Sequence, residues 1–347
     1  MSASTAQPDA VVAPPQTESD ETTAGNYFVS NYPPYSFWKP DYVSDFNEAI
    51  ERPPAEGQDL GLYVHIPFCR KRCHFCYFRV YTDKNAAAIN AYLDRAVDEL
   101  EIYAKKPFLG GRKPSFVYFG GGTPSYLSVK QLTSFTDRLK KILPWDEAEE
   151  VAFECEPGTL NDKKLKAIHD IGVTRLSLGI ENFDDRILEI NGRAHRSPEV
   201  QRAYEYAKEI GFQQINIDLI AGMIEETEDN WKRCMEKTIE MAPESVTIYE
   251  MEIPYNTTIY QRMQAEGKLV APVAGWETKR RWVDYAFKEL EKVGYTVGSA
   301  YTAVKSKDDV QFLYPLAPLA ERIIRISIIS SPTSRRWRRA SCRSTGP

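Results

Sequence analysis

The sequence predicts an α/β fold, built as a partial (β/α)6 barrel of the TIM type. From residue 61 onward, six short runs rich in β-branched and aromatic residues alternate with longer stretches of helical periodicity. Such alternation is typical of parallel strands joined by right-handed crossovers. Six units are too few for a complete eight-stranded barrel. A doubly wound open sheet is the alternative, because a sequence pattern does not show whether a sheet curls.

The elements follow in chain order from these patterns. The predicted strands are residues 61–66, 115–119, 150–154, 174–180, 215–220 and 245–252. Helical periodicity predicts helices between them, over residues 88–106, 128–143, 161–172, 197–211 and 230–242. Polar or glycine-rich signatures come at the ends of five strands, as HIPFC, GGGTPS, ECEPGTL, IEN and DLIAG. Since the carboxyl ends of parallel strands share one rim, we expect these signatures to lie together there.

Composition excludes some classes of protein. A length of 347 residues with 42% hydrophobic content allows one barrel-sized domain. The formal net charge of -5 gives no overall basic field, which disfavours nucleic acid as a ligand. No stretch is long and apolar enough to span a bilayer, and the N-terminus lacks the pattern of a secretory signal. We therefore expect a cytoplasmic location, where clustered cysteines indicate metal ligands or redox chemistry before disulfides.

Four segments are predicted along the chain. Residues 1–25 have few large apolar side chains and should be disordered, and residues 26–58 form an aromatic-rich arm expected to pack on the domain. Residues 59–300 form the core barrel. Residues 301–347 form an atypical tail: of the net charge of -5, residues 1–321 contribute -12 and residues 322–347 contribute +7. An out-of-frame or truncated end is one hypothesis for the tail, and a basic tail is the other.

Three cysteines stand close together after the first predicted strand. Cys69, Cys73 and Cys76 give the spacing C-x3-C-x2-C. A structural zinc ion normally takes four protein ligands, so His65 or His74 would have to complete such a site. An iron-sulfur cube held by three cysteines would instead leave one iron open to a small molecule. Both readings make these thiols metal ligands.

These residues resemble a known family. YVHIPFCRKRCHFCYF together with FGGGTPS is similar to radical S-adenosylmethionine (SAM) enzymes, specifically the branch of oxygen-independent coproporphyrinogen III oxidases, and the resemblance covers residues 61–255. It implies a radical SAM barrel and an oxidoreductase. It also implies a 4Fe-4S cluster on Cys69, Cys73 and Cys76 whose open iron chelates SAM. An electron from a donor such as flavodoxin or ferredoxin then cleaves SAM, and the 5′-deoxyadenosyl radical abstracts hydrogen from a small-molecule substrate, a tetrapyrrole in that branch.

The resemblance also implies a set of SAM contacts but names no catalytic residue. Residues 120–122 are three glycines that let the backbone approach a ligand closely. Asp218 is an acid within an apolar strand and needs a partner or a ligand. A rim salt bridge is the alternative for Glu154. The implied contacts are Tyr63, Phe75, Gly121, Gly122, Thr123, Glu154, Glu181, Arg193, Asp218 and, through its backbone, Met251.

The sequence departs from the oxidases at the substrate side. Tyr77 and Phe78 stand where those enzymes have Gly-Cys, and Glu181 stands where they have Gln. Three activities therefore stay open: oxidative decarboxylation of a porphyrinogen, methyl transfer with two SAM molecules, and haem delivery by a chaperone of the same branch.

The cysteines and histidines outside the motifs are assigned structural roles. Cys155 and Cys234 are expected to be small core residues. His169 and His195 are expected at the surface or at helix caps.

Overall fold

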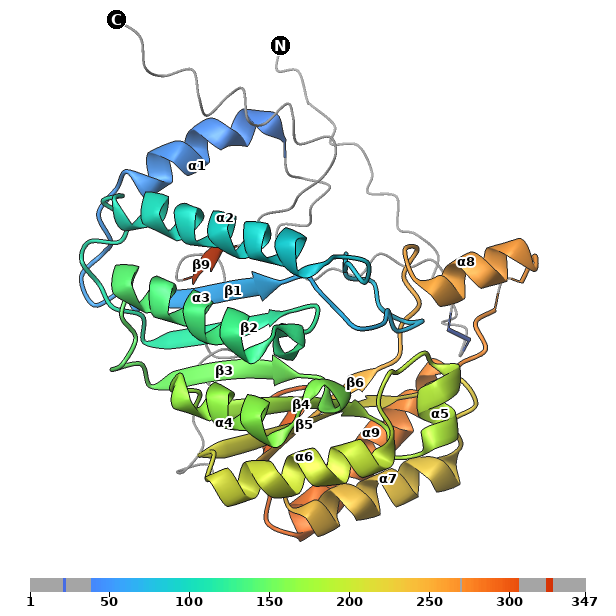
Figure 1. Ribbon diagram of the computed structural model, residues 1–347. Helices are drawn as coiled ribbons and strands as arrows, with labels where there is room; N and C mark the ends of the chain where they lie inside the picture. The colour runs from blue at the N-terminus through green and yellow to red at the C-terminus, as the bar shows by residue number, and fades with distance from the viewer. Residues whose placement is uncertain (1–20, 23–38, 269, 306–322, 327–347) are drawn as a thin grey trace, which may run out of the picture.

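The fold is a single curved sheet with helices along its outer side (Figure 1). The computed structural model describes residues 21–22, 39–268, 270–305 and 323–326. The sheet has nine strands in the order β7-β8-β6-β5-β4-β3-β2-β1-β9. Six of them pair in parallel as neighbours in chain order: β1 (Gly61–Ile66), β2 (Phe116–Gly121), β3 (Glu150–Cys155), β4 (Arg175–Glu181), β5 (Gln214–Ala221) and β6 (Ser245–Glu250). All six predicted strands are confirmed to within two residues at each end.

The five predicted crossover helices are confirmed as well. They are α2 (Ala86–Ala104), α3 (Val129–Ile142), α4 (Asp162–Asp170), α6 (Ser197–Ile210) and α7 (Glu228–Met241). Polar side chains fix where they begin: Asn85 accepts a hydrogen bond from the Ala88 amide, and Ser128 forms a capping box with Gln131. At the other end of α6, Gly211 takes the left-handed conformation (φ 90°) that terminates helices.

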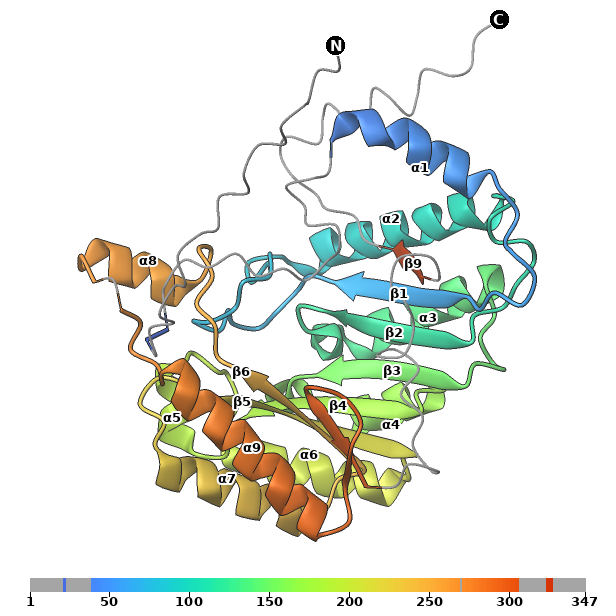
Figure 2. The same ribbon diagram turned by 180° about the vertical axis from the view of Figure 1, so that it is seen from behind.

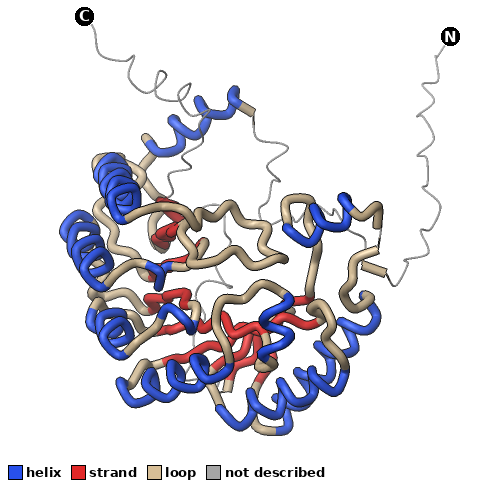
Figure 3. The backbone as a smooth tube through the Cα atoms, turned by 45° about the vertical axis from the view of Figure 1, so that its right-hand side comes forward, coloured by secondary structure: helices blue, strands red, loops and turns tan. Residues whose placement is uncertain are grey.

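The strand order decides between the two predicted architectures. A doubly wound sheet reverses its strand order and carries helices on both faces. Here the order from β1 to β6 has no reversal, and α2, α3, α4, α6 and α7 follow the same side of the sheet (Figures 1 and 2). Seen from another side, the helices form an arc outside the strands (Figure 3). The architecture is therefore a partial barrel, open between β7 and β9.

The remaining elements complete the described chain. They are η2 (Pro40–Tyr42), α1 (Val43–Ile50), η3 (Pro124–Tyr126), η4 (Pro157–Thr159), α5 (Asp185–Ile190), α8 (Thr258–Ala265), α9 (Trp276–Lys292), β7 (Thr296–Val297), β8 (Thr302–Val304) and β9 (Ile323–Ile326). The strands β7 and β8 extend the β6 edge in antiparallel fashion, while β9 pairs in parallel with β1. The sequence pattern did not predict β9, which lies in the tail that we called atypical.

Parts of the predicted organisation lie outside the described residues. These are the disordered segment except residues 21–22, the aromatic run 26–38, and the tail beyond residue 305 except β9. The assignments made for them stay predictions. Among the residues that the structure does describe, none of the helices has the length and apolarity needed to cross a membrane.

The two faces of the sheet differ in chemistry. On β5, Ile215, Ile217 and Leu219 belong to the apolar core shared with the helices, whereas Asn216 and Asp218 alternate with them. Because successive side chains of a strand point to opposite faces, the two polar residues face the inside of the curve. The acid that interrupts the apolar run therefore lies on the inner, concave face.

Replacing Phe153 by Ala should lower the free energy of unfolding by about 3–5 kcal/mol, because it leaves a cavity in the central strand β3. Phe153 is fully buried and its ring lies 5.2 Å from that of Phe119. The control is Phe46→Ala on α1, where half of the side chain is exposed, and where we expect a change within about 0.5 kcal/mol. Urea unfolding followed by circular dichroism measures both; equal effects would contradict this account of the core.

Candidate cofactor site at the carboxyl ends of the strands

The cysteine loop leaves β1 at the rim of the barrel. Two backbone hydrogen bonds hold this loop against other segments. The Cys69 amide donates to the Tyr81 carbonyl (3.1 Å), and the His74 amide donates to the Asn191 carbonyl (2.9 Å). Cys69 is buried, while Cys73 and Cys76 are partly buried. Burial raises the pKa of Cys69 to about 12 and that of Cys76 to about 11. A bound metal reverses this tendency, because it deprotonates the thiols that coordinate it.

Two side chains from other elements donate to the sulfur atoms. The Thr123 hydroxyl lies 3.2 Å from Cys69 Sγ, and Arg193 Nη1 lies 3.2 Å from Cys73 Sγ. Thr123 follows β2 and Arg193 follows α5, so residues 54 and 120 positions away converge on the loop. Donors of this kind favour thiolates, the form in which cysteine binds metal.

The glycines after β2 are required by close packing against this loop. A Cβ on Gly122 would lie 3.0 Å from both Cys69 Sγ and the Ile66 carbonyl oxygen. Gly121 adopts φ +115°, where a side chain is strained, and a Cβ there would meet the ring of His65. The GGGT motif and the cysteine loop therefore form one unit.

Three thiols and two nearby histidines bear on the choice between a cluster and a single zinc ion. Within the described residues, no group of three or more His, Cys, Asp or Glu side chains is arranged to hold one ion. His65 Nδ1 lies 3.1 Å from the Tyr63 hydroxyl, and His74 Nδ1 lies 2.9 Å from the Ile190 carbonyl. These contacts use Nδ1 of each ring and do not by themselves exclude zinc coordination through Nε2, whereas three thiols on one loop match the ligand set of an iron-sulfur cube.

Three carboxylates, those of Glu154, Glu181 and Asp218, line the concave face beside the loop. Glu154 accepts from the Tyr118 hydroxyl (2.6 Å) and the Gly121 amide (3.1 Å), in place of the rim salt bridge considered above. Asp218 accepts from Ser177 Oγ and Asn216 Nδ2, both at 2.8 Å.

The three carboxylates influence one another. Burial raises the pKa of Glu154 to about 7 and that of Glu181 to about 7, and the charge of Asp218 adds to both shifts. The pKa of Asp218 is raised as well, by burial. A cationic group bound among them would offset this repulsion.

Glu181 reaches the site through a strained backbone. It ends β4 with φ 67°, and the pairing with β5 shifts register between Gly179 and Glu181. A residue with a side chain in this region costs about 1–3 kcal/mol, and such strain clusters at functional sites. The turn directs Glu181 Oε1 to within 3.5 Å of Arg193 Nη2. The space at position 179 is tight, since a Cβ there would lie 3.1 Å from that carboxylate oxygen and 3.3 Å from Arg193 Nη2, and both groups would have to shift by a few tenths of an ångström.

Comparison with known proteins places this geometry in a family. The family model described as "Radical SAM superfamily" matches residues 63–238, just over half of the 347 residues. The chain belongs to the radical SAM superfamily. The cofactors are therefore a 4Fe-4S cluster and SAM.

Curated relatives come from two groups within this superfamily. The heme chaperone HemW of Bacillus subtilis is 33% identical over 211 residues, which are 60% of this chain and 55% of the relative. The oxygen-independent coproporphyrinogen III oxidase of Escherichia coli is 29% identical over 214 residues, covering 60% and 46%. The chain thus spans about half the length of the curated relatives it matches. The solved structure of the Escherichia coli oxidase HemN superposes with a TM-score of 0.71 at 24% identity, covering 83% of this chain and 66% of that one.

The remaining predicted SAM contacts lie at the edges of the site. Tyr63 stacks on Tyr118 on the concave face, with ring centroids 5.8 Å apart. Phe75 packs on a small apolar cluster that includes Met251. The Met251 amide donates to the Ala221 carbonyl (2.8 Å), and its carbonyl accepts from Lys279 Nζ (2.7 Å). Met251 therefore lies in that cluster with both backbone polar groups engaged inside the protein.

One structural assignment was wrong. His195 is fully buried, not at the surface, with Nδ1 3.2 Å from Glu156 Oε1 and Nε2 3.2 Å from the Ile180 carbonyl. Cys155 and Cys234 are buried as predicted, and His169 lies at the exposed last turn of α4.

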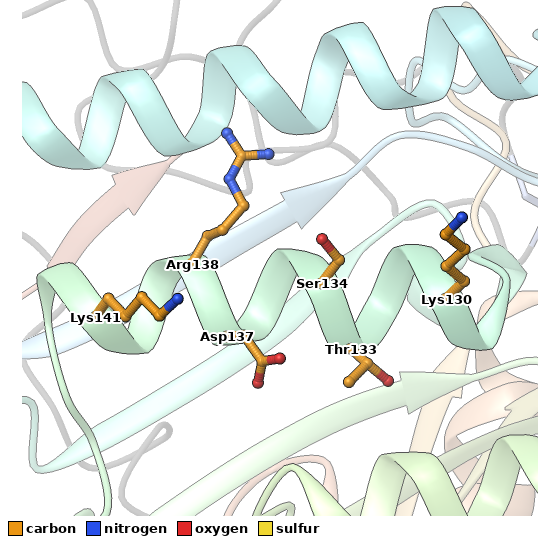
Figure 4. Close-up of a pocket in the computed structure, with 6 residues that line it drawn as sticks. All are labelled: Lys130, Thr133, Ser134, Asp137, Arg138 and Lys141. Atoms are coloured by element: carbon orange, nitrogen blue, oxygen red, sulfur yellow. The ribbon is translucent and has the colours of Figure 1, made fainter.

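A surface groove of about 430 Å³ lies elsewhere, on the outer side of α3 (Figure 4). It is lined by Lys130, Thr133, Ser134, Asp137, Arg138 and Lys141. Its residues belong to the helix layer and take no part in the rim site.

A partly buried polar network joins the loops after β4 and β5, and no pattern in the sequence predicted it. Glu226 accepts from the amides of Gly222 (2.6 Å) and Met223 (3.0 Å) and from Asn182 Nδ2 (2.7 Å). Burial raises the pKa of Glu226 to about 8. The network holds the loop after β5 in place. In the signature DLIAG only the glycine indicates a turn at this point.

The stability of the protein should therefore fall as the pH rises through 8, since Glu226 binds its proton more tightly in the folded state than in the unfolded chain. Its stabilising contribution is complete below the unfolded pKa of about 4.5 and is lost as the carboxyl ionises inside the protein. Glu226→Gln imitates the neutral acid. The melting temperature of Glu226→Gln minus that of the wild type should increase by about 2–4 °C between pH 6 and pH 9. Glu236→Gln, on the exposed side of α7, serves as the control, and a difference that does not change with pH would contradict the prediction.

Proposed function

We propose that this chain is a radical SAM oxidoreductase of the coproporphyrinogen III oxidase-like branch, acting by oxidative decarboxylation on a porphyrinogen or a related tetrapyrrole. The observation that carries the proposal is the convergence of three thiols, Arg193 and three carboxylates at one rim. When bound, the reduced cluster and SAM together supply a 5′-deoxyadenosyl radical that can abstract hydrogen.

The chain's own residues bind and orient these groups. Cys69, Cys73 and Cys76 would hold the cluster, and the donors Thr123 and Arg193 at 3.2 Å would tune it, because hydrogen bonds to sulfur shift cluster potentials. The glycine backbone after β2 would receive the methionyl part of SAM. The guanidinium of Arg193 suits a carboxylate, and the acids suit an ammonium group or ribose hydroxyls.

An external reductant fits the surface of the cysteine loop. Arg70, Lys71 and Arg79 are exposed on and beside it. Cations around the presumed point of electron entry favour an acidic donor, such as flavodoxin or ferredoxin, through complementary charge.

The cysteines provide the direct test. After anaerobic reconstitution, the wild type should hold about four iron atoms per chain and release 5′-deoxyadenosine from SAM under reduction. Changing Cys69, Cys73 or Cys76 to Ala should remove most of the iron and all of the cleavage. Cys155→Ala and Cys234→Ala are matched controls, because these thiols are buried away from the loop, and they should keep both. Equal iron content in the two sets would refute the ligand assignment.

Haem delivery is a second candidate function. Several curated relatives are named as heme chaperones. Tyr77 and Phe78, which replace the Gly-Cys of the oxidases, place their rings 4.3 Å apart on the cysteine loop, with Phe78 largely exposed. An exposed ring beside a partly buried one offers a flat macrocycle a surface for stacking.

A haem titration separates the candidates. A chaperone should show a Soret shift that saturates at one haem per chain, and the double variant Tyr77→Ala/Phe78→Ala should weaken binding about tenfold, or about 1.4 kcal/mol. Phe46→Ala, on the remote helix α1, should leave binding unchanged. Turnover of a porphyrinogen without saturable haem binding would favour the oxidase, while transfer of labelled methyl from SAM to product would favour a methyltransferase.

A further inference from the structure

His195 occupies a buried position behind the proposed SAM site. It lies between α5 and α6, it is fully buried, and each of its ring nitrogens faces an acceptor. Nδ1 lies 3.2 Å from Glu156 Oε1, and Nε2 lies 3.2 Å from the Ile180 carbonyl oxygen. A histidine whose ring connects two such elements has a more specific role than filling space in the core.

The Ile180 carbonyl lies where β4 departs from regular pairing. The pairing with β3 ends at Leu178, and the pairing with β5 passes from Gly179 directly to Glu181. Ile180 is thus the residue that the sheet register skips, and the next residue, Glu181, takes the left-handed conformation. Because a carbonyl oxygen only accepts, the tautomer of His195 with its proton on Nε2 is the one that donates to this irregular peptide.

Glu156 connects the same histidine to the cysteine loop. The carboxylate oxygen that faces His195 also accepts from Arg70 Nη2 (3.3 Å) and from the Gly158 amide (3.1 Å). Arg70 directly follows Cys69 in the chain. Glu156 and His195 together therefore link Arg70, the residue after Cys69, to the strained end of β4.

We infer that His195 is a positioning residue for SAM binding. It fixes the bulge that presents Glu181 to Arg193, and through Glu156 it holds this bulge in place relative to the cysteine loop. This inference rests on the proposed function, because it takes Glu181 and Arg193 as SAM contacts. His195 touches neither cofactor directly and acts through the Ile180 carbonyl.

Two conservative variants separate the two hydrogen bonds. In His195→Gln the side-chain amide can reach the position of Nε2 and still donate to the Ile180 carbonyl. In His195→Asn the shorter amide can replace only Nδ1 and its bond to Glu156. A histidine that merely fills the core would make the two variants equivalent.

The measurement is binding of labelled SAM to reconstituted protein by equilibrium dialysis, together with iron content and the change that SAM causes in the electron paramagnetic resonance spectrum of the reduced cluster. We expect unchanged iron content in both variants. The dissociation constant should rise at least tenfold in His195→Asn, with a weakened spectral change, and stay within threefold of the wild type in His195→Gln. His169→Asn, at the exposed end of α4, is the control and should match the wild type.

Two results would overturn the inference. One is equal SAM affinity in the Gln and Asn variants, whether retained or lost. The other is loss of iron in His195→Asn, which would give the histidine a role in cluster assembly and not in SAM binding. A wild-type protein that takes up iron but does not bind SAM would refute the proposed function itself, and the wild-type measurement distinguishes that failure from the others.

Discussion

The site depends on the burial of one face of a parallel sheet. Along β1–β6 the apolar side chains turn toward the helices, where residues such as Leu62, Phe119 and Leu176 are almost fully buried. This burial is the main favourable term in folding. Because every crossover returns along the same outer side, the inner face stays free for polar groups, and all the loops after the strands meet at one rim. The helix layer therefore determines where the chemistry can occur.

The groups gathered at this rim are unfavourable for folding by themselves. Three carboxylates within mutual influence, buried thiols and a left-handed Glu181 all oppose stability. They persist because the surrounding contacts fix them: the Tyr118 hydroxyl and the Gly121 amide hold Glu154, and Arg193 lies between a thiol and Glu181. A cationic ligand and a metal cluster would each remove part of this cost. The arrangement is thus preorganised for charge that the polypeptide itself does not supply.

A feature could be predicted when the interactions that form it join residues close in the sequence, and it could not be predicted when they join distant residues. Strand periodicity is local, so the six strands and five crossover helices could be predicted. An acid in an apolar strand correctly indicated that Asp218 needs partners, which are Ser177 and Asn216. His195 could not be placed, because its partners lie on the turn after β3 and in an irregular peptide of β4, and neither has a local signature. The four-residue strand β9 lies in the arginine-rich tail, and its pairing with β1 depends on an edge left open by the barrel. Nothing in the sequence distinguishes Glu226 from the surface acids beside it.

Under the proposed function, the residues that would bind the cofactors differ in their structural support from those that would meet the substrate. The glycine turn and the carboxylates lie in the strands or at their ends, and contacts with Thr123 and Arg193 join the thiols of the cysteine loop to them, so a change there would disturb the whole rim. Tyr77 and Phe78 follow the last cysteine on a loop, and the exposed Phe78 can change without altering any strand. A scaffold divided in this way can keep one set of cofactors while loop residues select different molecules, since specificity depends on contacts that the core does not use. Relatives named as heme chaperones and as oxidases are both compatible with such a division, and the aromatic pair is the part of this chain that would distinguish them.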